Sequence, residues 1–132
     1  MGTRATSTFT LDSWDEQPYD EQEGARLTRT RITKTFSGDL DGTSSAETLM
    51  AHGQVQGSAA YVGFERITGR LHGRAGSFVL HHSASGSGGE RSGSWTVVPD
   101  TGTGDLLGLR GTGEIVVTPD GGHTFVLDYQ LD

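Results

Sequence analysis

Four side chains in the middle of the sequence belong to types that exchange protons: Glu47, Tyr61, Glu65 and His82. A carboxylate beside an imidazole and a phenol can polarise a carbonyl group, or move a proton during an isomerisation or a cyclisation. This chemistry requires the groups to lie within hydrogen-bonding distance of one another. Since they come from separate segments of the chain, the fold must bring them together.

The segments around these residues are predicted to be β-strands. Apolar and polar residues alternate with a period of two, and no window keeps the spacing of three and four residues that a long helix needs. The 21 glycines fall between β-branched and aromatic runs, as turn residues do. We expect eight strands, at residues 6–17, 25–36, 43–52, 58–68, 76–83, 93–98, 111–118 and 123–131. We also expect a flexible loop at residues 83–89 and one helical turn at residues 105–109.

Consecutive strands with short connections predict an antiparallel meander, and closing a meander into a barrel removes its two unpaired edges. We therefore predict an all-β fold, a closed eight-stranded antiparallel meander barrel, in one domain that spans residues 1–132. Eight strands leave an interior that holds packed side chains or one small ligand. A sandwich of two open sheets is the alternative architecture.

Strand pairing is expected to place the four candidate residues close together. A hairpin that turns near residues 70–73 pairs Glu65 with Phe78 and Tyr61 with His82, and the preceding hairpin brings Glu47 beside Tyr61. Directly paired side chains have Cβ atoms about 4.5–5.5 Å apart. We therefore expect Glu47, Tyr61 and His82 to form a row that can share hydrogen bonds. In the alternative arrangement, Glu47 and His82 face water and Tyr61 alone packs inward.

Glu65 is expected to have apolar neighbours. Burial among them raises the pKa of a carboxyl group and would make Glu65 a proton donor. In the alternative, Glu65 forms a salt bridge at the rim of the barrel, for example with Lys34. The aromatic and aliphatic side chains that we expect to line a ligand are Trp14, Phe78, Leu80 and Trp95.

Both faces of the predicted sheet are apolar. The face opposite Glu65 carries Met50, Val62, Phe64, Val79, Trp95 and Val97. The sequence therefore leaves open which face forms the lumen. Because a monomer rarely exposes an apolar patch larger than a few hundred Å², we expect the outer face to be covered by another copy of the chain in a homo-oligomer.

Five blocks of the chain read KTFSGDLDGTS at residues 34–44, YVGFERITG at 61–69, GSFVLHH at 76–82, WTVVP at 95–99 and GTGDLLGLRG at 102–111. Together they resemble an uncharacterised bacterial family, domain of unknown function 3224, over nearly the whole chain. The resemblance implies a closed eight-stranded barrel similar to that of allene oxide cyclase, and an oligomer. It implies no activity, because a shared barrel does not entail a shared reaction.

Charge and composition argue against several partners. The formal net charge is −7 and the pI is near 5.1, which disfavours binding to a phosphate backbone, so we expect no nucleic acid. The chain contains no apolar segment typical of a membrane span or a signal sequence, so we expect no membrane partner and a cytoplasmic location.

The sequence also predicts no metal and no cofactor. Cysteine is absent, and His81 and His82 point to opposite faces of a strand. The run at residues 39–42 resembles the start of a calcium loop, but Met50 stands where that loop requires a glutamate. The glycines of residues 102–108 do not match a dinucleotide-binding motif, and no long helix follows them.

Two functions from different classes fit these predictions. In the first, the barrel binds a small apolar metabolite and acts on it as a cofactor-free isomerase or cyclase. In the second, it binds or carries such a molecule without converting it. A barrel whose lumen is filled by side chains is a structural third possibility. Whether the protein is an enzyme stays open at this point.

Overall fold

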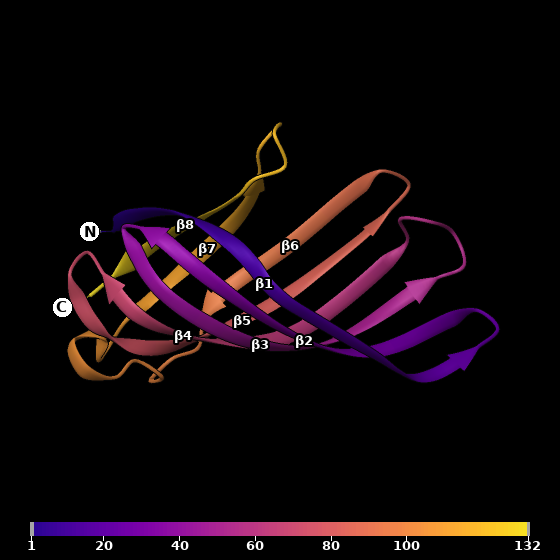
Figure 1. The fold of residues 1–132 in the computed structure, drawn as a ribbon, viewed down its shortest axis with the longest axis horizontal. Helices are drawn as coiled ribbons and strands as arrows, with labels where there is room; N and C mark the ends of the chain where they lie inside the picture. Colours follow the sequence, from indigo (N-terminus) through magenta and orange to yellow (C-terminus); the bar gives the residue numbers. More distant parts are fainter. Residues whose placement is uncertain (1, 132) are drawn as a thin grey trace.

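The computed structural model describes residues 2–131 and shows a closed barrel of eight antiparallel strands in chain order (Figure 1). The strands are β1 (Thr3–Gln22), β2 (Ala25–Gly38), β3 (Leu40–Gly53), β4 (Ala59–Leu71), β5 (Arg74–Ser87), β6 (Glu90–Val97), β7 (Arg110–Val117) and β8 (His123–Gln130). Residues 3–9 of β1 pair with residues 123–129 of β8 and close the barrel. The all-β fold and the closed meander barrel are therefore confirmed, and the two-sheet sandwich is not the architecture.

The hairpins are longer than the sequence pattern indicated, because their turns are tighter. Between β4 and β5 the chain turns at His72 and Gly73, whose φ angles of +47° and +82° suit a two-residue turn. The flexible loop expected at residues 83–89 is wrong: β5 continues to Ser87, and β6 begins at Glu90.

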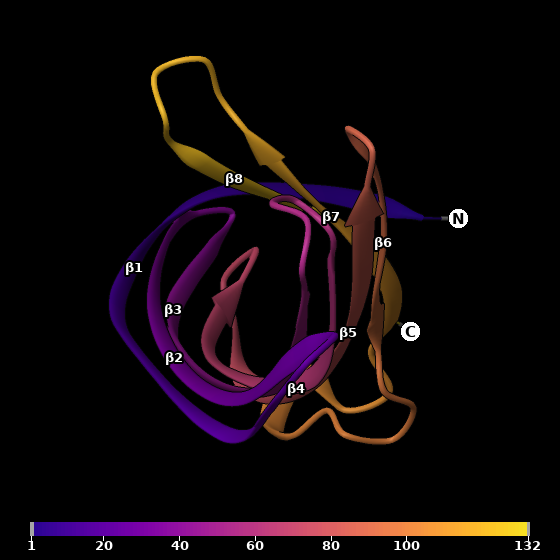
Figure 2. The same cartoon turned by 90° about the vertical axis from the view of Figure 1, so that its right-hand side faces the viewer.

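The barrel is closed over part of its length and open beyond it. Pairing between β1 and β8 ends at Phe9 and His123, and β6 pairs with β7 through Trp95–Gly113 and Thr96–Thr112. Past this level β1 to β6 continue as a curved sheet of long hairpins, while the β7–β8 hairpin leans away from them (Figures 1 and 2). We call the end with the long hairpin tips the open end, and the other the closed end.

Side chains fill the closed end. Phe36 lies between Phe9 and Phe125, with ring centroids 5.3 and 5.9 Å away. The expected helical turn is present as the short 3-10 helix η1 (Gly104–Leu106), which places Leu106 and Leu109 in this core. Within residues 2–131, no helix is long and apolar enough to cross a membrane.

Candidate functional site

The structure decides which strand face is the lumen. On β4, Glu65 and Ile67 are buried and point inward, whereas Val62 and Phe64 are exposed on the outer face. Met50, Trp95 and Val97, which the sequence grouped with that outer face, lie instead on strand positions that face the lumen.

The observed register separates Glu47 from the other candidates. Glu47 pairs with Phe64, and Met50 takes the place opposite Tyr61, so the expected pairing of Glu47 with Tyr61 is wrong by three residues. An odd shift turns a side chain to the other face of the sheet. The hairpin was expected to turn at about Gln54, but its connection occupies residues 54–58 and is therefore centred further along the chain.

Glu47 lies on the outer surface between two arginines. Its Oε1 atom is 2.9 Å from Arg29 and 3.0 Å from Arg31, and hydrogen bonds from Arg31 and Arg29 lower the pKa of its carboxyl group. Exposed ion pairs of this kind contribute little to stability. Glu47 therefore stands outside the lumen.

Tyr61, His82 and Glu65 do meet in the lumen, although the register between β4 and β5 is shifted by two residues from the expected one. Glu65 pairs with Leu80 and Gly63 with His82, so an even shift keeps all three side chains on the inner face. The Nε2 atom of His82 lies 2.7 Å from Oε1 of Glu65, and the Tyr61 hydroxyl lies 3.3 Å from Nδ1 of His82. We call this set the Tyr61–His82–Glu65 relay.

The hydrogen-bond types fix the tautomer of a neutral His82. A carboxylate can only accept, so Nε2 carries the proton and donates it to Glu65. The Nδ1 atom is then the acceptor for the Tyr61 hydroxyl. Burial raises the pKa of Tyr61 above its ordinary value, so the phenol remains a hydrogen-bond donor at neutral pH.

Glu65 is a buried carboxylate and not a proton donor. Burial alone would raise the pKa of Glu65, but a hydrogen bond from His82, the charge of Lys34 and a hydrogen bond from Ser44 outweigh it and lower the pKa to about 2. The Nζ atom of Lys34 lies 3.3 Å from Oε1, and the Ser44 hydroxyl lies 2.5 Å from Oε2. The expected raised pKa is therefore wrong, and the salt bridge with Lys34 lies inside the barrel.

A cavity of about 160 Å³ lies beside the relay, at the level where the closed part of the barrel ends. Beside the relay, Gly63 lies between Thr48 and His82 on the inner face, where β3 and β4 pack closely. A Cβ atom there would lie 2.4 Å from the Glu47 carbonyl oxygen and 2.6 Å from Cγ2 of Thr48. The cavity is lined by Phe9, Leu11, Trp14, Ile32, Lys34, Ala46, Thr48, Met50, Tyr61, His82, Ile115 and His123.

The four side chains expected to line a ligand lie in three different places. Trp14 lines the cavity, because a β-bulge between Leu11 and Ser13 turns it inward. Phe78 and Leu80 are fully buried in the core of the closed end. Trp95 meets the ring of His82 edge-on, with the ring centroids 6.2 Å apart.

Most of the cavity residues were absent from the lining that the sequence predicted, and two of these, Lys34 and Thr48, are polar residues on which the site depends. Lys34 lies between Ile32 and Phe36 at a spacing of two, and this shared parity with apolar residues was a signal for an inward lysine. Thr48 carried no comparable signal, because threonine is common on both faces of a strand. Its hydroxyl is buried without a hydrogen-bond partner among the described residues.

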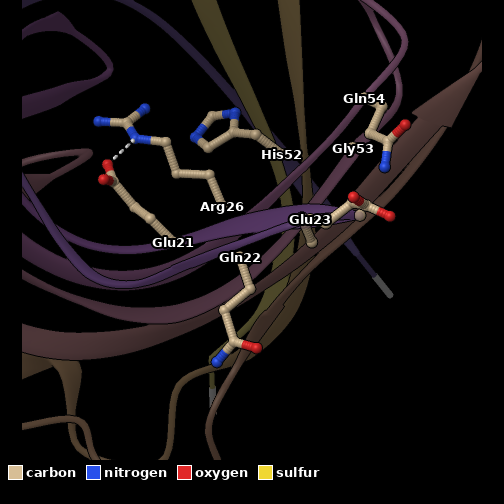
Figure 3. Close-up of a pocket in the computed structure, with 9 residues that line it drawn as sticks. Glu21, Gln22, Glu23, Arg26, His52, Gly53 and Gln54 are labelled. Carbon is tan, nitrogen blue, oxygen red and sulfur yellow. Dashed lines mark hydrogen bonds and ion pairs between the residues drawn. The ribbon is translucent and has the colours of Figure 1, made fainter.

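A larger hollow of about 630 Å³ lies between the tips of the β1–β2 and β3–β4 hairpins (Figure 3). Its lining residues are exposed except for His52, which is half-buried. The ion pair drawn there joins Arg26 to Glu21 at 3.0 Å, at the surface. Since this hollow is open to water, it has the character of a gap between hairpins. Within residues 2–131, no three or more metal-ligating side chains gather.

Comparisons with known proteins agree with the barrel. No curated protein matches the chain. The family model described as "Protein of unknown function (DUF3224)" matches residues 5–129. The crystal structure of a protein of unknown function from the DUF3224 family of Shewanella oneidensis MR-1 is similar, with 34% sequence identity, a TM-score of 0.87, and coverage of 100% of this chain and 98% of that chain.

Proposed function

The chain belongs to the DUF3224 family of proteins of unknown function, and from this premise we propose that its barrel binds a small, largely apolar molecule in the lumen. The observation that carries the proposal is the cavity of about 160 Å³, which is mostly walled by apolar side chains and borders Tyr61 and His82. Ligand sites are typically apolar hollows with a few oriented polar groups. A cavity of about 150 Å³ engineered into another protein binds benzene, so this one has room for a molecule of similar size.

The relay supports a proton transfer on a bound carbonyl compound. The Tyr61 hydroxyl turns from Nδ1 of His82 to the carbonyl oxygen and donates its hydrogen bond there, and the freed Nδ1 removes a proton from the neighbouring carbon. The electron pair of the C–H bond forms the C=C bond of an enolate, the π pair of the carbonyl group moves to the oxygen, and the imidazolium is stabilised by Glu65 at 2.7 Å. Where a C=C bond is conjugated with the enolate, return of the proton to the far carbon of that bond moves the double bond, restores the carbonyl group and completes an isomerisation that needs no oxidant and no cofactor.

Binding without conversion is the second candidate, and one observation favours it. In the structure Nδ1 of His82 already accepts the Tyr61 hydroxyl at 3.3 Å, so the lone pair that would act as a base is occupied. A carrier needs no free base. In a carrier, the buried Glu65 would serve only to stabilise the barrel.

The two candidates are separated by following cyclohexanone, a neutral ring that fits the cavity, in deuterated water. We expect the protein to be stabilised by cyclohexanone in a thermal shift assay and to speed the exchange of its α-hydrogens, seen by NMR. His82→Gln keeps a donor for Glu65 but lacks the base, so it should retain the thermal shift and lose the exchange.

The matched control is His81→Gln, because His81 lies on the outer face and stacks on Phe64 with ring centroids 5.2 Å apart. This variant should behave as the wild-type protein does. Stabilisation without exchange in the wild-type protein would support the carrier over the isomerase. Neither stabilisation nor exchange would overturn the proposal as a whole.

We also propose that the outer face of β3 and β4 contacts another copy of the chain. Leu49 and Val62 pair directly, and both lie near Phe64; their exposed fractions are 49%, 48% and 58%. Large exposed apolar side chains that gather in this way are typical of interfaces. We call these three residues the outer patch.

A further inference from the structure

We infer that the molecule bound in the lumen is electrically neutral, carries one hydrogen-bond-accepting oxygen such as a ketone, and is about the size of a single six-membered ring. This inference rests on the proposed binding function and names the chemical class of the ligand. Three independent features of the cavity support it: its charge, its unpaired hydroxyl and its volume.

The charges at the cavity already cancel. Lys34 lines the cavity, and its ammonium group lies 3.3 Å from the Glu65 carboxylate; the two side chains are 7% and 1% exposed. The lysine also lies 4.7 Å above the ring of Phe9, an apolar surface that faces its charge. A ligand carboxylate or ammonium group at this depth would therefore be buried without a counter-charge, which is strongly unfavourable.

The hydroxyl of Thr48 has no partner inside the described part of the chain, although its residue is 4% exposed. Thr48 lines the same cavity as Tyr61, from the neighbouring strand. A buried hydroxyl without a hydrogen bond is unfavourable and rare in native proteins. The hydroxyl oxygen is covered in the structure, so a rotation of the Thr48 side chain must first turn it to the cavity. A ligand carbonyl oxygen, which has two lone pairs, then accepts from Thr48, and also from Tyr61 once its hydroxyl turns away from His82.

The volume limits the ligand to a small ring. About 160 Å³ is close to the cavity of about 150 Å³ that holds benzene in an engineered protein. The walls made by Ile32, Ala46, Met50 and Ile115 offer contact to the apolar part of such a ring. A long acyl chain does not fit without displacing these side chains.

The test compares four ring compounds as probes of the full chain by NMR titration: cyclohexanone, cyclopentanecarboxylate, cyclohexylammonium and benzene. We expect cyclohexanone to bind at least tenfold more tightly than either charged ring. Thr48→Val removes the hydroxyl at nearly constant shape and should weaken cyclohexanone about 3–10-fold, while benzene affinity stays unchanged. Because an unpaired buried hydroxyl is lost, the melting temperature of the free variant should not fall.

Two further variants serve as controls. Thr48→Ser keeps the hydroxyl and should keep most of the affinity for cyclohexanone. Thr43→Val makes the same change at an exposed position of β3 and should alter neither affinity nor melting temperature.

The outcomes distinguish this inference from the proposed function. If a charged ring binds as tightly as cyclohexanone, or if Thr48→Val leaves cyclohexanone affinity unchanged, the ligand class is wrong while the binding function stands. If none of the four probes binds, benzene included, the proposed function itself is wrong.

Discussion

At Glu65 a full negative charge is held inside the barrel, and its partners explain how. Burying a carboxylate and an ammonium group costs several kcal/mol for each ion, and good geometry with further hydrogen bonds must offset that cost. Lys34, His82 and Ser44 all bond to this one carboxylate. The same contacts orient His82 toward Tyr61, so one group serves both stability and the relay.

Stability in acid should depend on this carboxylate. Its pKa falls from the ordinary 4.5 to about 2 in the folded protein. The stabilisation is therefore complete above about pH 4.5 and is lost as the pH falls toward 2. The shift corresponds to on the order of 3 kcal/mol. Glu65→Gln should be less stable at neutral pH and should lose much less stability between pH 5 and pH 2, measured by urea unfolding.

Glu47→Gln is the control for this experiment, because Glu47 is an exposed carboxylate paired with arginines. It should follow the acid dependence of the wild-type protein closely. An acid dependence of Glu65→Gln equal to that of the wild-type protein would show that Glu65 is not ionised in the folded barrel.

At the scale of the strands, close backbone packing is visible where β3, β4 and β5 cross the closed end. Gly69 pairs with Gly42 on one side and with Gly76 on the other. A Cβ atom on Gly69 would lie 2.1 Å from the carbonyl oxygen of Asp41, which is rigid backbone. Position 69 therefore requires glycine because the neighbouring strand leaves no room for a Cβ atom, and not because of a positive φ angle.

Gly69→Ala should accordingly destabilise the barrel by about 2–3 kcal/mol, the effect expected when a well-packed site is overfilled. Thermal or urea unfolding measures the change. Ser45→Ala, on the exposed face of β3, is the comparison and should stay within about 0.5 kcal/mol of the wild-type protein. Equal stability of the two variants would mean that the strands can separate at Gly69 without cost.

At the scale of the whole molecule, the barrel is filled at its closed end, hollow near its middle and splayed at its open end. Its net charge of −7 sets up a general repulsion between copies. Near the outer patch, however, Glu47 is paired with Arg29 and Arg31. Local charge is therefore no obstacle to contact through Leu49, Val62 and Phe64.

Self-association through the outer patch should be visible in the molar mass in solution. We expect the wild-type protein to be oligomeric at micromolar concentration, and Phe64→Glu to shift the mass toward the monomer, because a charge would be buried at the contact. Light scattering after size-exclusion chromatography measures both.

Leu107→Glu changes an exposed leucine elsewhere, 74% accessible, and should leave the mass unchanged. A wild-type monomer would contradict the proposed contact. So would a Phe64→Glu variant that keeps the oligomeric mass.

The sequence by itself determined the strands and their order. Alternation with a period of two and glycine-rich turns are local features, and short connections force neighbouring strands to pair, so the meander and its closure were predictable. The resemblance of five blocks to one family was also visible at this level. The pairing of Tyr61 with His82 was off by an even number of residues, which left both on the same face.

The tertiary structure alone decided the register and the inward face. Register depends, to a single residue, on where each connection turns the chain, as the segment at 54–58 shows by turning Glu47 outward. Both faces are apolar, so only closure of the barrel shows that Lys34, Thr48 and Glu65 share its interior. The pKa of Glu65 follows from these non-local partners, because neighbours in space and not in sequence set the charge of a buried group.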